Sequence, residues 1–141
     1  MSSKKKKNFR KKIRGLEQRR QKVIKELLNF EELLRGSAAT VYTKCGRHNC
    51  WCKDGEGHPH TRITWTEKSK GYTRKIPDEE LPWVKRVTDN YRRFQSLRRS
   101  LKNIEEEGRE LQKGLADVLI TDTRKTKDYL WTKKENRKYN E

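Results

Sequence analysis

All three cysteines of this chain lie within eight residues, and histidines follow closely. Cys45, Cys50 and Cys52 are succeeded by His58 and His60. A structural zinc ion takes four thiolate or imidazole ligands in a tetrahedron, and three cysteines with one histidine supply that number. Metal binding also adds folding energy to a chain that has few apolar residues. The spacing therefore predicts a structural Zn²⁺ held by Cys45, Cys50, Cys52 and His58.

The identity of the fourth ligand stays open between two histidines, and other uses of the thiols are weaker. His60 is the substitute for His58, whereas His48 lies too close to its neighbours to contribute. A redox pair is disfavoured because there is no Cys-x-x-Cys and no surrounding βαβ pattern. A catalytic zinc is disfavoured because four protein ligands close the site. The plain alternative is three unliganded thiols in a loop.

A basic amphipathic helix is expected ahead of this cluster. From Phe9 to Leu34 apolar residues recur at alternating spacings of four and three, and Arg20 alone interrupts them. The pattern predicts a helix over residues 8–35, with glycine as its stop. Residues 1–7 hold four consecutive lysines and are expected to form a disordered basic tail through charge repulsion.

A small sheet and a second helix are expected after the basic helix. Strand-forming residues around the cluster predict a three-stranded antiparallel sheet within residues 36–77, with the Cys3His knuckle inside it. A proline and three acidic residues introduce a long helix over 78–120. Residues 121–141 read as a basic C-terminal tail. The predicted fold class is α+β, with two long antiparallel helices flanking the sheet and its zinc-knuckle-like loop.

The composition points to a polyanionic partner. Of 141 residues, 40% are charged and 30% apolar, and the net charge is +17. Residues 1–35 carry +9 and residues 36–77 carry +5, whereas residues 78–120 are neutral. Lysine and arginine that neutralise phosphates release condensed counterions, which favours binding. The excess charge therefore predicts nucleic-acid binding by the N-terminal half.

The expected nucleic-acid contacts come from the tail, the first helix, the loop and the strands. Trp51 is included because its ring is suited to stacking on a base, although it is equally suited to capping the metal site or packing on the sheet. The predicted residues are Lys4, Lys5, Lys6, Lys7, Arg10, Lys11, Lys12, Arg14, Arg19, Arg20, Arg47, Trp51, Lys53, Arg62, Arg74 and Lys75. The ordinary alternative for a charge run is a solvated helix face.

The region around the cysteines resembles a known family. The motif Cys45-Gly46-x3-Cys50-x-Cys52, then Gly55-Glu56-Gly57-His58, Ile76-Pro77 and Asn90-Tyr91-Arg92-Arg93-Phe94, is similar to an uncharacterised bacterial and archaeal small domain family. The resemblance covers roughly residues 36–104 and implies His58 as the matching histidine. Genes of that family often lie near transposases, which implies a mobile-element or phage context. The chain departs from the pattern at Thr61-Arg62-Ile63, which replaces an aromatic run, and in its polylysine start.

These observations predict a non-enzymatic DNA- or RNA-binding accessory protein. No phosphate-binding glycine loop and no nucleophile–base pair is seen in the sequence. The alternative is a coiled-coil adaptor whose helices dock a transposase-like or other protein partner, or a second copy in a homodimer. No apolar run reaches the roughly 18–20 residues of a membrane span, so no membrane association is expected. A cytoplasmic location, associated with the nucleoid or with ribonucleoprotein, follows.

Overall fold

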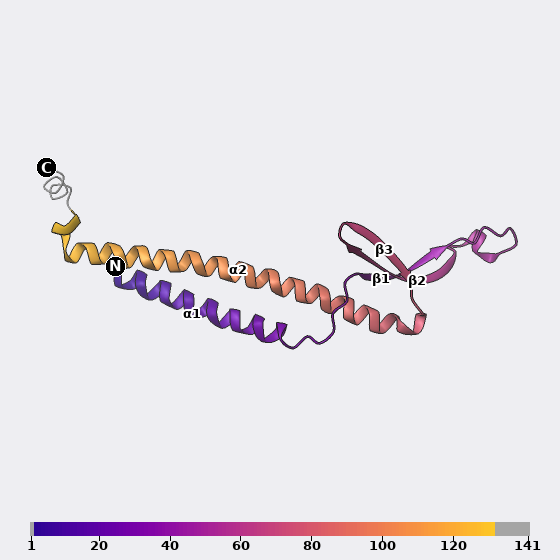
Figure 1. Cartoon of the computed structure of the whole chain (residues 1–141), viewed down its shortest axis with the longest axis horizontal. Helices are drawn as coiled ribbons and strands as arrows, with labels where there is room; N and C mark the ends of the chain where they lie inside the picture. The colour runs from indigo at the N-terminus through magenta and orange to yellow at the C-terminus, as the bar shows by residue number, and fades with distance from the viewer. Residues whose placement is uncertain (1, 132–141) are drawn as a thin grey trace. The chain divides into compact units, whose positions relative to one another are not determined.

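The computed structural model describes residues 2–131 and divides the chain into two compact units. We call Leu27–Leu97 the sheet unit, and Met1–Glu26 with Arg98–Glu141 the helical unit. Helix α2 (Leu81–Thr126) contributes its first part to the sheet unit and the remainder to the helical unit (Figure 1). The mixed α+β class, with a three-stranded antiparallel sheet and a long helix, agrees with the sequence prediction.

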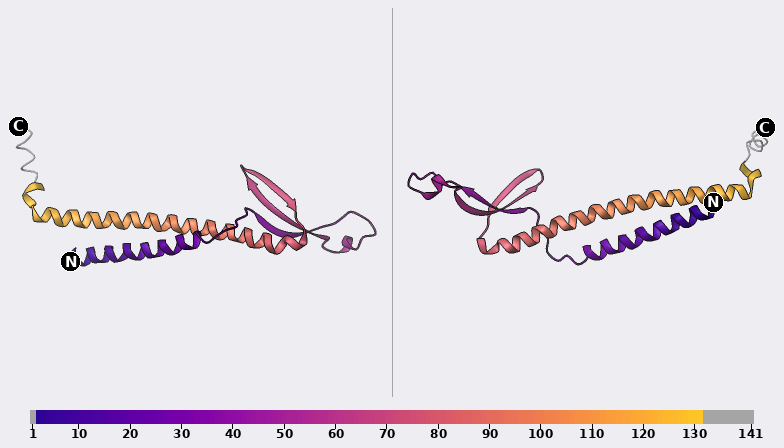
Figure 2. Two further views of the ribbon diagram at one scale, coloured as in Figure 1. Left: turned by 60° about the horizontal axis from the view of Figure 1, so that its bottom comes forward. Right: turned by 180° about the vertical axis from the view of Figure 1, so that it is seen from behind.

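The helical unit pairs α1 (Ser2–Leu27) with the later part of α2. The two helices run side by side in opposite directions in all three views (Figures 1 and 2). Lys6 Nζ lies 2.6 Å from Asp122 Oδ2, and Arg20 Nε lies 3.9 Å from Glu105 Oε1, so the N-terminal end of α1 meets the C-terminal end of α2. Leu16 of α1 and Ile104 of α2 are the buried apolar residues of this unit within the described part of the chain. The antiparallel packing thus follows the apolar stripe of each helix.

The ends of both helices differ from the sequence prediction. Helix α1 starts at Ser2, so residues 2–7 are helical rather than a disordered tail. Lysine is a good helix former, and the hydrogen bond from Lys6 lowers the pKa of Asp122, which favours the ion pair that holds this end. Helix α2 continues to Thr126, past the predicted limit of 120, and a 3-10 turn follows at Asp128–Trp131. Residues 132–141 of the predicted basic tail lie outside the described residues.

The sheet unit contains strands β1 (Ser37–Thr43), β2 (His58–Glu67) and β3 (Lys70–Lys75) in the antiparallel order β1-β2-β3. Its buried side chains come from β2, from α2 and from the connection between β1 and β2. They are Cys52, Thr61, Ile63, Val84, Val87, Thr88 and Leu97. The Thr61 hydroxyl donates a hydrogen bond to Asp78 Oδ1 at 2.8 Å, and the Ile76 N–H donates to the Thr61 carbonyl at 2.9 Å. These bonds attach the sheet to the approach to α2.

The predicted first helix, 8–35, is too long at its C-terminal end. Helix α1 stops at Leu27, and the chain then runs without helical structure to β1. The ring of Phe30 packs edge-on against Phe94 with centroids 5.7 Å apart, and the Leu34 N–H donates to the Val87 carbonyl at 3.1 Å. Contacts with α2 therefore half-bury Phe30 and Leu34 without a helix, whereas Leu28 and Leu33 remain exposed.

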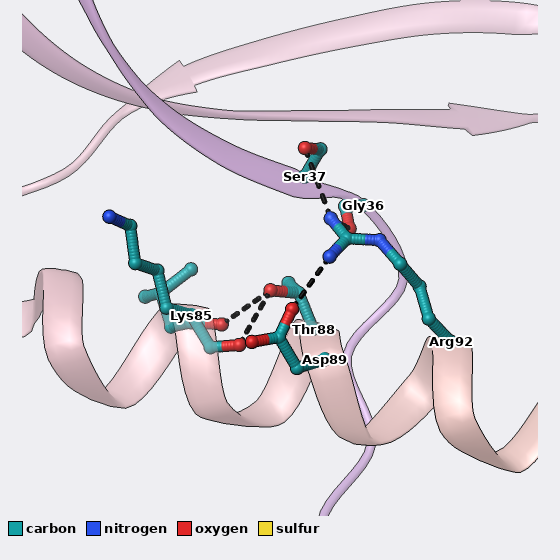
Figure 3. Close-up of polar contacts among 7 residues, drawn as sticks. Gly36, Ser37, Lys85, Thr88, Asp89 and Arg92 are labelled. Carbon is teal, nitrogen blue, oxygen red and sulfur yellow. Dashed lines mark hydrogen bonds and ion pairs between the residues drawn. The ribbon is translucent and has the colours of Figure 1, made fainter.

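Arg92 fastens the end of this segment to α2 (Figure 3). Its Nη2 donates to the Gly36 carbonyl at 3.4 Å and to Ser37 Oγ at 3.1 Å, and its Nη1 lies 2.6 Å from Asp89 Oδ1. The buried Thr88 hydroxyl donates to the carbonyl of Val84 within the helix. One guanidinium thus joins the first strand to the helix that carries the core.

Within residues 2–131, none of the helices combines the length and the apolar character that crossing a bilayer requires.

Two glycines of α2 provide a test of the helix pairing. A Cβ at Gly108 would meet nothing within 4 Å, whereas a Cβ at Gly114 would lie 2.6 Å from the ring of Phe9. Alanine in a helix interior is about 0.5–1 kcal/mol more favourable than glycine. We expect Gly108→Ala to raise the free energy of unfolding by about that amount. Gly114→Ala should give little or no gain because the Phe9 ring must move. Equal stabilisation by both in urea unfolding would contradict the packing.

Candidate metal centre

The predicted cysteine cluster occupies the loop between β1 and β2. Thr43, the last residue of β1, pairs with His58, the first residue of β2, and residues 44–57 connect them. A 3-10 turn, η1 (Trp51–Asp54), lies inside this loop and positions Cys52. Gly57 has φ +112°, and a Cβ there would come within 2.6–2.8 Å of the Thr43 backbone. The two ends of the loop thus lie against one another, and this close approach leaves room only for glycine at position 57.

The folded loop brings four potential ligand atoms together. The thiols of Cys45, Cys50 and Cys52 and a ring nitrogen of His58 all lie within 4.8 Å of one another. The Sγ atoms of Cys45 and Cys52 are 3.4 Å apart, and Cys50 Sγ is 3.2 Å from His58 Nε2. Cys52 is buried, Cys50 and His58 are half-buried, and Cys45 is exposed. These residues are positioned to bind a metal ion.

The donor set and its spacing fit a tetrahedral ion. Zn–S and Zn–N bonds of about 2.3 and 2.0 Å place tetrahedral ligands roughly 3.5–3.8 Å apart, close to the separations in the loop. His60 lies on β2 opposite Val41 and does not join the cluster. Of the two histidines that the sequence leaves open, the structure therefore brings His58 to the cysteines. His48 also lies outside the cluster.

Local hydrogen bonds prepare Cys45 as a thiolate. The backbone N–H of Arg47, helped by the side chains of Cys52 and His58, lowers the pKa of the Cys45 thiol to about 6. Cys52 behaves differently. Its bond from the backbone N–H of Cys45 favours the thiolate, but burial and the neighbouring thiols outweigh that bond and raise the pKa of Cys52. A metal ligand must be deprotonated, so Cys45 is the thiol best prepared to meet an incoming cation.

The predicted nucleic-acid residues of the helical unit fall into two groups. Lys6 and Arg20 take part in ion pairs with Asp122 and with Glu17 and Glu105. The others project from α1 as exposed side chains: Lys4, Lys5, Lys7, Arg10, Lys11, Lys12, Arg14 and Arg19. The structure therefore gives Lys6 and Arg20 a second role in holding α1 to α2.

The predicted nucleic-acid-binding residues of the sheet unit lie in three different places. Arg47, Trp51 and Lys53 are exposed on the connection of residues 44–57, which we call the metal loop. Arg62 and Lys75 are directly opposite one another on β2 and β3. Arg74 is next to Lys75 and so points to the opposite face of the sheet, where its guanidinium lies 5.9 Å from the centre of the Trp65 ring. The structure thus brings Arg62 and Lys75 together and sets Arg74 apart from them.

Two contacts help to hold the loop together, and the sequence analysis gives only one of them, the position of Trp51 beside the metal site, as an alternative. The Lys44 ammonium donates to the Lys53 carbonyl at 3.2 Å and braces the two sides of the loop. The Trp51 ring lies edge-on to the His58 ring with centroids 4.9 Å apart, yet 66% of Trp51 remains exposed. Trp51 therefore supports a ligand histidine and presents a free ring surface together. This contact fits the capping position that the sequence leaves open for Trp51, whereas no sequence signal indicates the Lys44 contact.

Substitution of a ligand tests the cluster directly. We expect the wild-type protein, purified without added metal, to hold about one ion per chain. Cys50→Ser should lose most of it because three ligands remain, and the sheet unit should unfold at lower temperature. His60→Gln is the matched control, since it removes a nearby imidazole outside the cluster. Metal retained in Cys50→Ser but lost from His60→Gln, by elemental analysis, would reverse the ligand assignment.

The thiols of Cys45 and Cys52 both make metal binding depend on pH, over different ranges. At neutral pH this thiol is already largely ionised because its pKa lies at about 6. Acidification through that value adds a proton that competes with the ion, so affinity should fall steeply below pH 6. At pH 7 uptake should still release protons, because the pKa of Cys52 is raised. Competition titration with a chromophoric chelator from pH 5 to 8 measures this; an affinity independent of pH would contradict it.

The comparison with known protein families matches the part of the chain that contains the cysteine cluster. The sequence model of a family described as "Domain of unknown function (DUF6788)" matches residues 13–86, which is more than half of the chain and contains the complete metal loop. No curated protein and no solved structure gives a match. The match agrees with the resemblance to an uncharacterised small domain family. This chain therefore belongs to the family of the domain of unknown function DUF6788.

Proposed function

We propose that this protein is a non-enzymatic nucleic-acid-binding accessory protein in which a structural zinc ion fixes the loop between β1 and β2. The observation that carries the proposal is the row of cations on α1. The first acidic residue of the chain is Glu17, and the preceding residues contain eight lysines and arginines. Seven of them form no ion pair within residues 2–131: Lys4, Lys5, Lys7, Arg10, Lys11, Lys12 and Arg14.

The spacing of these cations suits a phosphate backbone. Residues 4–14 span about 15 Å of helix at 1.5 Å per residue. Duplex DNA carries one phosphate charge per about 1.7 Å of its axis, so several phosphates fall within reach. Binding through phosphates is strong at low salt and carries little sequence information.

Cations at this end of a helix also have an intrinsic cost. The N-terminus of a helix carries partial positive charge, and each cation there is unfavourable by about 0.3–1 kcal/mol. Helix α1 has no acidic residue in its first turn to offset this cost. A polyanion would remove it, which is a physical reason for these lysines beyond solubility.

Zinc is the ion proposed for the loop because of its ligand chemistry. Three thiolates and one imidazole form a closed tetrahedral set that is typical of structural zinc. Few other residues of the loop are buried, so chelation supplies stability that packing does not. The resemblance to a family encoded near transposases adds the proposal of a mobile-element or phage context.

A protein-interaction adaptor is the second candidate, supported by exposed apolar side chains. In the sheet unit Leu28 is 79% exposed and Trp83 is 46% exposed, and Leu33 is also exposed. Such residues are suited to a protein partner or a second copy. Sedimentation measures this alternative: concentration-dependent dimerisation without any nucleic-acid affinity would favour the adaptor.

Salt-titrated binding to duplex DNA, single strands and structured RNA tests the proposal. Binding should weaken steeply with salt. The variant Lys7→Gln/Lys11→Gln/Arg14→Gln removes three unpaired cations and should lower the duplex salt slope by about 2.7, at roughly 0.9 per phosphate contact. The matched control, Arg99→Gln/Lys102→Gln/Lys113→Gln, removes the same charge from α2. Equal losses in both variants, or binding that ignores salt, would contradict a specific role for α1.

A further inference from the structure

The two faces of the sheet differ in chemistry. Side chains alternate along a strand, and the face that includes Thr61 and Ile63 is the buried one. We call the opposite face, which includes His60, Arg62, Thr64, Thr73 and Lys75, the outer face. Arg62, Thr64, Thr73 and Lys75 are exposed. On β2 and β3 the outer face thus carries cations and hydroxyls, and β1 adds Ala39 and the exposed Val41 to it.

Two like charges meet on the outer face. Arg62 and Lys75 are direct cross-strand partners, an arrangement that destabilises a sheet when nothing neutralises it. Neither side chain has an ion pair or a hydrogen bond within the described residues. No acidic residue of β1, β2 or β3 lies on this face, because Glu67 has the alternation of the buried one. The pair is therefore suited to a bound anion.

The outer face leads to the exposed ring of Trp51. His58 shares the alternation of His60 and Arg62 and so belongs to the same face, and the Trp51 ring rests on the edge of His58. Four residues of strand separate His58 from Arg62, which is about 14 Å. Arg47 and Lys53, both exposed, accompany Trp51 on the loop. The Arg62–Lys75 pair and His58, against which the exposed Trp51 ring packs, therefore share the alternation of one face of the sheet, a few nucleotides apart.

We propose that this surface binds single-stranded nucleic acid, with phosphates at Arg62 and Lys75 and a base stacked on Trp51. The inference rests on the proposed nucleic-acid binding and specifies its substrate. Single-strand sites combine a cationic track with aromatic rings on which bases stack. In a duplex the base faces are already stacked on one another, so an exposed ring gains nothing from them. The combination therefore selects unpaired strands over duplexes.

Charge-neutralising variants of the full chain test the phosphate contacts. Arg62→Gln/Lys75→Gln should weaken binding to a labelled oligothymidine at least tenfold and lower its salt slope by about 1.4, at roughly 0.7 per contact. Lys68→Gln/Lys70→Gln, at the β2–β3 turn, removes the same charge from the same hairpin outside the outer face. Equal effects of the two pairs would overturn the proposal, because affinity would then depend on the net charge of the hairpin and not on the positions of the cations.

Substitutions of Trp51 test the stacking. Trp51→Leu keeps apolar bulk against His58 but has no ring, and should weaken oligothymidine binding by about 5- to 160-fold, since stacking is worth about 1–3 kcal/mol per base. Trp51→Phe should retain most of the wild-type affinity. Trp83→Ala, at the other exposed tryptophan of the sheet unit, should leave the affinity unchanged. Elemental analysis of each variant confirms that the metal loop is intact.

The outcomes separate this inference from the function on which it rests. A wild-type protein that binds duplex DNA while neither the outer-face pair nor Trp51→Leu affects single strands would overturn the inference and leave the proposed function standing. Outer-face variants that weaken duplex and single-strand binding equally would also overturn it. A wild-type protein without affinity for any nucleic acid would overturn both.

Discussion

Both units are built on the apolar stripe of a single helix. Val84 and Val87 of α2 are buried in the sheet unit, and Ile104 of the same helix is buried in the helical unit. With 30% apolar residues in the chain, each core is small, and hydrophobic burial is the dominant favourable term in folding. Ion pairs at the ends of α1 and the guanidinium of Arg92 then fix the direction of the packed elements. Their own contribution to stability is modest.

The metal loop occupies the part of the sheet unit that packing does not reach. Between residues 44 and 57 only Cys52 and Gly57 are buried, so the loop cannot be held by apolar contacts. Chelation is one of the few ways in which so short a segment gains order, because binding free energy becomes folding free energy. Apolar burial therefore orders α2 and β2, and a metal ion held by the four clustered residues would order the loop.

The sequence predicts well those features that depend on local chemistry. Ligand number and spacing select Cys45, Cys50 and Cys52, and alternation along β2 identifies its buried face. It fails where distant contacts decide. The spacing of Phe30 and Leu34 continues the helical pattern, yet their partners Phe94 and Val87 hold them in an extended segment. Likewise Lys6 has its partner at Asp122, near the far end of the chain, and no local rule indicates that pairing.

His58 has two positions in the fold that belong to different kinds of structure. It pairs with Thr43 at the end of the β1–β2 ladder, and its ring nitrogen is one of the four clustered ligand atoms. The same residue therefore ends a row of strand pairs and belongs to the cluster that is positioned to bind a metal ion. For an ion bound there, release of the ligand and fraying of the ladder are not independent. Loss of the ion would therefore loosen the end of the β1–β2 ladder, and fraying of the ladder would move a ligand away from the ion.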